Sequence, residues 1–478
     1  MQSEELALLV RTIQTMKCEQ QTIEVKAAHD GCPTRLFNTL SSFSNQDEGG
    51  IIVFGMDERI AFKVVGVYDA QDLQKKVTEQ CKQMEPPVRP LFTVYEFEEG
   101  IVVSAEIPGV DIVERPVFYK GAGRIKGSYI RVGESDEPMS EYEIYSYDAF
   151  RRRTHDDLRP VENAKMAFFD EDLLGKYLAA VKRERRNIGE NVTNGEILEL
   201  MGVTCDDIPT LAGLLVFSKF PQAQFPQLCV TAVVVPGRSI GDTGNEGERF
   251  LANQRITGPI SEMLDAAVDF VRRNGRTRTI IDSDGKRTDK PEFPIIAVRE
   301  AILNALVHRD YSTHTDSVPI RIIMYEDRME IVNSGGLYGR ITIDSLGKVR
   351  PDTRNSTLAN ILELLSVTEN RYSGIPTIRK ELQSAGLPPP IFIVSRGEFS
   401  VTFKNGHFDE TTEDKGREEA VLAFCQSPRS RDEISRFTGF SQYYTMSRII
   451  KPMVDQGLLR MTIPDKPKSK HQKFVTVA

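Results

Sequence analysis

The sequence lacks any apolar run approaching the roughly 20 residues that a membrane span needs, although apolar residues make up 40% of its 478 positions. Its first residues, Met1 to Glu5, also lack the basic and apolar regions of a signal peptide, so we expect a cytoplasmic protein. The six cysteines form no CxxC pair and have no histidine at zinc-binding spacing. This pattern predicts reduced thiols and argues against a zinc site.

Two further absences restrict the function. The chain contains no G-x-x-x-x-G-K-[ST] phosphate-binding motif, which a helicase motor needs, so helicase activity is not expected. There is also no general excess of basic charge, because the net charge is -8. Contacts with nucleic acid must therefore come from local basic patches.

The most informative stretch is residues 300–311, Glu-Ala-Ile-Leu-Asn-Ala-Leu-Val-His-Arg-Asp-Tyr. Its apolar residues recur at helical spacing, so Glu300, Asn304 and His308 fall every four residues on one polar stripe. An Asn oxygen can hold a hard divalent cation while a Glu one turn earlier orients water, which suits a nucleotide site. The alternative is an ordinary amphipathic helix with a solvated polar face.

Two glycine-containing segments follow this helix. The first is Ile331-Val-Asn-Ser-Gly-Gly-Leu, an apolar strand that ends in Gly335 and Gly336. The second is Ser373-Gly374, which opens a helix predicted over residues 376–383. Glycine at such points lets backbone N–H groups approach phosphate or adenine closely.

The order Glu-x-x-x-Asn-Ala-x-x-His-Arg-Asp-Tyr, Asn-Ser-Gly-Gly, Ser-Gly-Ile resembles the GHKL ATP-binding fold of gyrase, histidine kinases and MutL. More narrowly it resembles a divergent branch found in bacterial proteins labelled RecG-like helicases or transcriptional regulators. The resemblance implies that Asn304 binds Mg²⁺ and that Glu300 positions the attacking water as the ATPase base. It also implies that nucleotide contacts come from His308, Asn333, Gly335, Gly336, Ser373 and Gly374.

The sequence departs from that branch at two positions. Asn333 stands where active relatives carry an adenine-reading Asp, and Tyr372 stands where the branch usually has Gly. An Asn can still hydrogen-bond adenine, but it presents an amide to the exocyclic amine instead of a carboxylate. The resemblance therefore implies nucleotide binding more firmly than turnover.

Near the N-terminus, a strand over residues 22–26 carries Glu24 and Lys26 on one face, and an apolar strand over 51–56 runs into Asp57. Together with Glu19, these carboxylates are candidates to meet at one point. Clustered carboxylates bind Mg²⁺ or Mn²⁺, which activates water against a phosphodiester.

The Glu-x-Lys strand, the Gly49-Gly50 turn, the Gly-x-Asp end, Arg115-Pro116 and residues 127–133 resemble the Schlafen AlbA-type domain over residues 15–145. In animal Schlafen proteins the residues matching Glu19, Glu24 and Asp57 form a metal-dependent ribonuclease site, whereas many bacterial members are nucleic-acid-binding regulators. Three interpretations stay open here: a nuclease, nucleic-acid binding without cleavage, or a structural surface pair. The candidate nucleic-acid contacts are Lys26, Lys120, Arg124, Lys126 and Arg131, most of them beside a glycine-rich turn over residues 120–129.

Between these regions, the charged run 147–162 predicts a hinge. Helices are expected over 170–188, 193–200 and 258–274, residues 209–217 form a helix or a buried strand, and 274–290 form a polar loop. Residues 337–357 form a loop that, in the resembled fold, closes over nucleotide as a lid. Lys348, Arg350 and Arg354 are then candidates to meet phosphates, with a plain surface loop as the alternative.

The C-terminal residues 417–478 reverse the overall charge, with eleven Lys and Arg against six Asp and Glu. Helices are predicted over 418–426, 430–437 and 441–455, with Ser430 and Glu433 as a capping box, and strands over 458–463 and 473–477. This is the pattern of a winged helix-turn-helix, whose third helix would enter a DNA groove. The contacts would come from Gln442, Tyr443, Tyr444 and Arg448, with Lys468 and Lys470 on the wing; a module for protein contacts is the alternative.

The predicted fold class is α+β and multidomain. We expect a Schlafen-type α/β domain over 1–150, a GHKL-like α/β sandwich over 160–408 with its core at 290–405, and a winged helix-turn-helix over 416–478. The favoured hypothesis is a nucleic-acid-binding transcriptional regulator whose affinity for DNA or RNA depends on ATP and Mg²⁺. The resemblance alone implies that it is a dimer. The alternatives are a metal-dependent nuclease, which would serve in defence against phage, and a nucleotide-clamped dimer that assembles partners.

Overall fold

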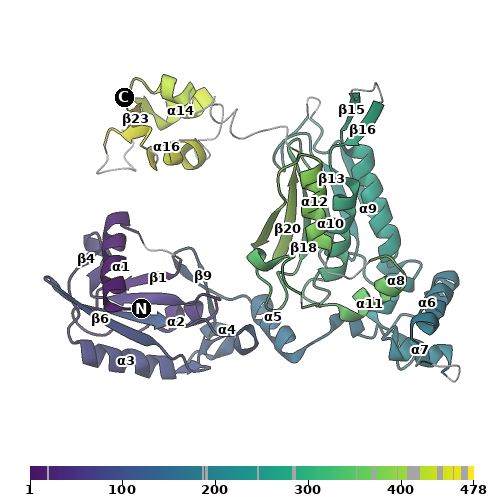
Figure 1. The fold of residues 1–478 in the computed structure, drawn as a ribbon, viewed down its shortest axis with the longest axis horizontal. Coiled ribbons are helices and arrows are strands. Elements are labelled where there is room, and N and C mark those ends of the chain that lie inside the picture. The colour runs from purple at the N-terminus through teal and green to yellow at the C-terminus, as the bar shows by residue number, and fades with distance from the viewer. Residues whose placement is uncertain are drawn as a thin grey trace.

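The structure is a computed structural model of residues 1–478. Its description leaves out residues 19–20, 186–187, 189–191, 245–246, 282–286, 351, 369–372, 396, 406–419, 439–444, 456, 464–471 and 478, as well as the side chains of residues 278–281, 287–289, 432, 447–449, 452 and 455. It is a mixed helix and strand protein with several separate sheets, which confirms the predicted α+β class (Figure 1).

The N-terminal part is built on a four-stranded sheet in the order β1-β2-β7-β6. Its strands are β1 (Ile23–Lys26), β2 (Gly50–Phe54), β6 (Leu91–Phe97) and β7 (Gly100–Ile107), and only the β1–β2 pair is parallel. Helix α1 (Ser3–Met16) packs on one face, and α2 (Phe37–Ser44) with α3 (Ala70–Lys82) on the other.

Strand β2 is apolar along its length, and the reason is that helices cover both of its faces. Successive strand residues point to opposite faces, so Ile52 and Phe54 pack with α2 and α3, whereas Val53 packs with α1. Because both faces are covered, alternation with polar residues is not needed.

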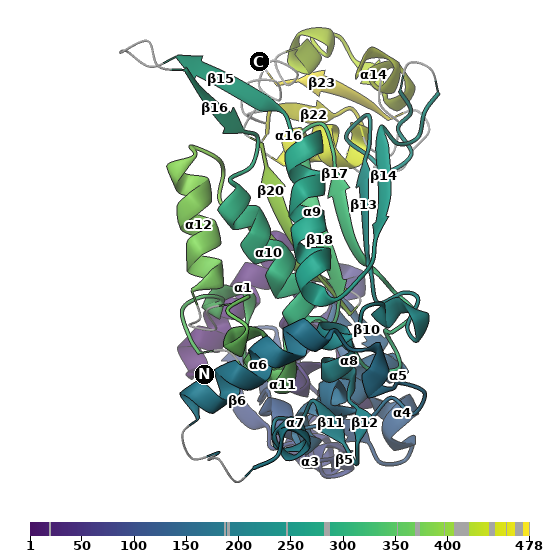
Figure 2. The ribbon, with the colours of Figure 1, turned by 90° about the vertical axis from the view of Figure 1, so that its right-hand side faces the viewer.

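The central part contains a six-stranded sheet in the order β14-β13-β17-β18-β20-β19. The strands are β13 (Val230–Val234), β14 (Ala252–Ile256), β17 (Ile320–Met324), β18 (Arg328–Ser334), β19 (Ile391–Ser395) and β20 (Glu398–Lys404). Helices α9 (Ile260–Asn274), α10 (Ile295–His308) and α12 (Gly374–Ser384) lie side by side on one face (Figure 2). Helix α10 sits in the middle, and its apolar residues belong to the largest core cluster.

Five further helices surround this sandwich: α5 (Glu141–Arg152), α6 (Glu171–Glu184), α7 (Asn194–Leu200), α8 (Leu211–Phe217) and α11 (Ser356–Leu364). Of the two alternatives for residues 209–217, the structure has the helix over Leu211–Phe217, all seven residues of which are buried, while Pro209 belongs to the short strand β12 (Ile208–Pro209). Helices α5 and α11 were not predicted. Ser140 and Glu143 form a capping box at the start of α5, a local signal that identifies this helix start.

Two expectations about loops were wrong. The polar loop expected over 274–290 contains a hairpin of β15 (Thr277–Ile281) and β16 (Arg287–Pro291). The glycine-rich turn expected over 120–129 contains a short helix, α4 (Gly123–Gly127). Its last residue, Gly127, lies against the backbone of Tyr119, where a larger residue would not fit.

The C-terminal part has its own small core, formed by Val421, Cys425, Ile434, Ile450, Met453, Leu459 and Phe474. Its elements are α14 (Arg431–Thr438), a π-helical segment Thr445–Ile450, α16 (Lys451–Asp455) and a sheet of β21 (Arg429–Ser430), β23 (Lys473–Thr476) and β22 (Leu459–Met461). The Ser430–Glu433 capping box is confirmed, with the Glu433 carboxylate 2.8 Å from the Ser430 amide nitrogen. The winged helix itself stays a prediction.

Within the described residues, none of the helices is long and apolar enough to cross a bilayer.

Candidate nucleotide site

A cavity of about 190 Å³ lies between α10, the start of α12, the ends of β18 and β20, and the segment that follows β18. Its lining includes Glu300, Asn304, His308, Asn333, Gly335, Gly336, Ser373 and Gly374, the residues that the resemblance assigns to nucleotide. Of the three candidates for phosphate contacts in the loop after β18, Arg354 lines the cavity, whereas Lys348 and Arg350 do not belong to its lining. Three stretches of sequence, each separated by dozens of residues, therefore converge on one cavity.

All three residues of the polar stripe of α10 line this cavity. Glu300 and Asn304 are half-buried, and the residues between them, Ala301, Ile302 and Leu303, are buried in the core. The side-chain nitrogen of Asn304 is buried and has no hydrogen-bond partner among the described residues. A buried amide without a partner costs about 1–3 kcal/mol, which is the kind of cost that a binding site bears.

The N-terminus of α12 presses directly on this stripe. A Cβ atom placed on Gly374 would lie 3.0 Å from both the Asn304 amide nitrogen and a Glu300 carboxylate oxygen. Only glycine therefore leaves room for the two side chains and lets the helix N-terminus, which favours anions, approach them.

We expect Gly374→Ala to weaken ATP binding by about tenfold or more without unfolding the protein. The added methyl group would displace Glu300 and Asn304, which are flexible, while alanine favours helix over glycine by about 1 kcal/mol. Calorimetric titration together with thermal denaturation separates the two effects. Gly175→Ala in α6 is the matched control, because a Cβ there meets no atom within 4 Å; equal losses in both variants would contradict the assignment.

The opposite wall of the cavity is the end of β18. Asn333 is buried, and its side-chain amide donates to the Ser334 carbonyl over 3.2 Å. Gly335 adopts a φ of +99°, and a Cβ at this position would lie 3.0 Å from the Asp310 backbone nitrogen. This glycine therefore permits a left-handed turn that other residues adopt poorly, directly after the strand.

His308 ends the stripe. Its side chain is exposed and lines the cavity, where desolvation and the nearby Arg354 charge lower its pKa from 6.5 to about 4. The imidazole is consequently neutral at physiological pH, so it offers one hydrogen-bond donor and one acceptor without a charge.

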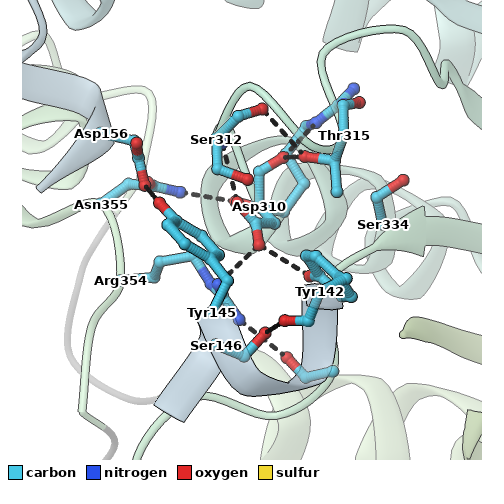
Figure 3. A network of polar contacts seen from close by, with 12 residues as sticks. Tyr142, Tyr145, Ser146, Asp156, Asp310, Ser312, Thr315, Ser334, Arg354 and Asn355 are labelled. Atoms are coloured by element: carbon cyan, nitrogen blue, oxygen red, sulfur yellow. Dashed lines mark hydrogen bonds and ion pairs between the residues drawn. The ribbon is translucent and has the colours of Figure 1, made fainter. Parts of the chain in front are cut away.

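A buried ion pair includes one residue of the cavity lining. Arg354 lines the cavity and donates to the Asp310 carboxylate over 2.9 Å, and the two side chains are 6% and 0% exposed. The same carboxylate accepts hydrogen bonds from the Tyr142 hydroxyl (2.7 Å) and the Ser312 amide (2.8 Å), as Figure 3 shows. Desolvation raises the pKa of Asp310, but Arg354 and these hydrogen bonds outweigh it, and the net pKa lies below the ordinary value of 3.8.

The beginning of α11, just after Arg354, is held by two further side chains. The Asn355 amide donates to the carbonyls of Val307 and Arg309 at the end of α10, each over 2.8 Å. The Asp157 carboxylate accepts from the Thr357 and Leu358 amides (2.9 and 3.0 Å), where a carboxylate is favourable at a helix N-terminus. These contacts connect the start of α11 both to the end of α10 and to the segment that follows α5.

In the N-terminal part, Glu24 is buried and its carboxylate is bound by Lys26 and by Arg131, the latter over 2.9 Å. Asp57 bonds Arg59 over 3.0 Å, and Glu19 lies outside the described residues. The described part of the chain contains no group of three His, Cys, Asp or Glu arranged to hold a metal. Glu24 is thus neutralised by two cations, and the nuclease interpretation gains no support from it.

The candidate nucleic-acid contacts differ in availability. Lys126 is exposed, whereas the guanidinium of Arg131 is buried between Glu24 and Asp136, so contact with a phosphate would require these ion pairs to open. Lys120 and Arg124 pair with Glu85 and Asp148. In the C-terminal part, Gln442, Tyr443, Tyr444, Lys468 and Lys470, and the side chain of Arg448, lie outside the described residues.

Tyr142 and Asp310 were missed from the sequence, although Asp310 lies in the motif that carries the nucleotide resemblance. No local pattern links them, because they are 168 positions apart. The Glu300 and Asn304 oxygens are hard ligands of the type Mg²⁺ prefers, and the unpartnered Asn304 amide beside them fits a site completed by a phosphate-bearing ligand.

Comparison with family models bears on both parts. Residues 19–140 match the model described as "Schlafen, AlbA_2", and residues 318–403 match "Putative ATP-dependent DNA helicase recG C-terminal", an ATPase-type model. The chain combines a Schlafen AlbA_2-type domain with a RecG C-terminal ATPase-type domain. The resemblances seen in the sequence are thereby confirmed, and the two domain types associate the chain with nucleic-acid function.

Two solved structures match parts or most of the chain at low sequence identity. The DIP2311 protein from Corynebacterium diphtheriae is 18% identical, with 94% of this chain and 92% of that chain covered at a TM-score of 0.41. The N-terminal domain of a putative ATP-dependent DNA helicase RecG-related protein from Nitrosomonas europaea is 22% identical, with 28% and 91% covered at a TM-score of 0.23. No functionally curated protein matches the sequence.

Proposed function

We propose that this protein binds an adenine nucleotide with Mg²⁺ in the cavity beside α10, and that occupancy of the cavity modulates nucleic-acid binding by the Schlafen AlbA_2-type domain and the C-terminal part. The convergence of Glu300, Asn304, Asn333 and Gly374 on one cavity carries the proposal. The cavity also has the usual composition of a nucleotide site, an apolar lining with a few polar groups.

Within this proposal each group has a role. Asn304 and Glu300 hold Mg²⁺ and a water molecule near the phosphates, while the N-terminus of α12 at Gly374 faces the anion. Asn333 meets the adenine amine. Turnover by Glu300 is a further step that binding does not require.

The nucleic-acid part of the proposal rests on the domain types and on local basic groups. Lys126 is exposed, and residues 417–478 carry a net excess of five basic residues, eleven against six. Phosphate contacts by such groups make affinity dependent on salt. Since the chain lacks a Walker-type motif, we propose a regulator and not a helicase.

The test is a titration of the wild-type protein with ATP and Mg²⁺, followed by nucleic-acid binding measured with and without the nucleotide. We expect micromolar ATP binding and a change of about five- to 150-fold in affinity for DNA or RNA, the usual range for coupled sites. Fluorescence anisotropy with labelled duplex DNA and single-stranded RNA at several salt concentrations measures the second effect. An absence of heat with ATP would refute nucleotide binding, and equal nucleic-acid affinities would refute the modulation.

A further inference from the structure

The wall of the cavity is linked to helix α5 at two points and to the N-terminal part of the chain at one. We define the cavity wall as residues 337–350 and 352–354, which follow β18. Its Tyr338 ring meets Phe150 of α5 edge-on at 5.2 Å, and its Arg340 forms an exposed ion pair with Asp111 at 3.2 Å. Its last residue, Arg354, reaches α5 through the buried carboxylate that also binds Tyr142.

Arg354 is the single lysine or arginine among the described residues that line the cavity. Its guanidinium lies 4.8 Å from the Tyr338 ring centroid, and its Nε atom is buried without a partner in the described part of the chain. The guanidinium presents five donors, of which one bonds the Asp310 carboxylate over 2.9 Å and one the Gly336 carbonyl over 3.4 Å, so donors remain for a second anion. A phosphate in the cavity would find its cationic partner here.

We propose that Tyr142 and Asp310 are positioning residues for phosphate recognition by Arg354, so that α5 completes the nucleotide site from outside the ATPase-type domain. This inference rests on the proposed nucleotide binding and extends it. Asp310 holds one edge of the guanidinium, and the Tyr142 hydroxyl holds Asp310, as Figure 3 shows. A rigidly oriented guanidinium loses less freedom on binding phosphate than a mobile one.

The same contacts also make the docking of α5 depend on whether nucleotide occupies the cavity. Coupling between two sites is reciprocal, so if α5 docking improves nucleotide binding, nucleotide must stabilise α5 docking by the same factor. Helix α5 directly follows the Schlafen AlbA_2-type domain, whose match ends at residue 140, and begins at Glu141. Nucleotide thereby stabilises one orientation of that domain.

The test compares Tyr142→Phe with Tyr145→Phe, a matched variant on the same helix whose lost hydroxyl bonds Asp156 and not Asp310. Affinities for ATP and for adenosine are measured by calorimetry. We expect Tyr142→Phe to weaken ATP binding about three- to tenfold, a typical value for one hydrogen bond, with no change for adenosine. A general structural defect would weaken both ligands equally. Tyr145→Phe should bind both ligands as the wild type does.

Hydrogen exchange of the α5 amides gives the second readout. In the wild type we expect ATP to slow amide exchange over Glu141–Arg152. In Tyr142→Phe the factor by which ATP slows this exchange should be several-fold smaller. Two results would overturn the positioning role and leave the proposed nucleotide binding intact, provided that the wild type binds ATP. The first is an unchanged ATP affinity in Tyr142→Phe, and the second is an absence of any ATP effect on α5 exchange in the wild type. Failure of the wild type to bind ATP would instead overturn both.

Discussion

Replacing Asp310 with alanine is expected to lower the free energy of opening around α10 by about 3–5 kcal/mol, the usual cost of breaking a buried ion pair. The carboxylate is fully buried and neutralises Arg354, which is only 6% exposed. Its removal would leave an uncompensated guanidinium in the core together with an unbonded Tyr142 hydroxyl. Native-state hydrogen exchange of the α10 amides measures the effect, since a multidomain chain has no single unfolding free energy.

The control is Asp111→Ala, which removes the partner of Arg340 in the same cavity wall. Both side chains of that pair are about half-exposed, at 60% and 47%, so solvent screens the pair and its loss should leave opening around α10 nearly unchanged. Comparable effects in the two variants would contradict the special role of burial.

Because the pKa of Asp310 lies below its ordinary value, its ion-pair stabilisation is present at neutral pH and is lost as the pH falls through that pKa.

Replacing Asn304 with alanine is expected to weaken Mg²⁺-dependent ATP binding by about 100-fold while leaving the fold as stable or more stable. Loss even of a residue that only supports a metal ligand typically costs 10–100-fold in affinity, and Asn304 is proposed to act directly. The stability change has the opposite sign because the Asn304 amide is buried without a partner. Alanine removes that cost and is also the better helix former.

Calorimetric titration and thermal denaturation of the same samples measure both effects. Asn274→Ala is the matched control, because that amide lies at the end of α9 and donates to the Phe270 carbonyl away from the cavity. If Asn304→Ala retained full affinity, the α10 stripe would have no role in binding. If it were instead destabilised, the side chain would have a structural partner.

The sequence alone determined the features that depend on local periodicity. Glu300, Asn304 and His308 are spaced by one helical turn, so their common stripe follows from helix geometry once the helix is accepted. The same applies to the apolar strand β2 and to the Ser430–Glu433 capping box, whose partners are three residues apart. Both family resemblances also rest on short local motifs, and the family models confirm them.

The tertiary structure decided which charged groups neutralise one another. Arg131 was a candidate to contact nucleic acid, yet it is buried against Glu24, 107 positions away in the sequence. Likewise, Arg354 pairs with Asp310 over 44 positions, and Tyr142 joins them over 168. Such pairs depend on how distant segments pack, and burial in a low-dielectric interior then makes each pairing obligatory. Local sequence patterns carry no record of that packing, so they identify the residues of the nucleotide cavity but not the ion pair that supports it.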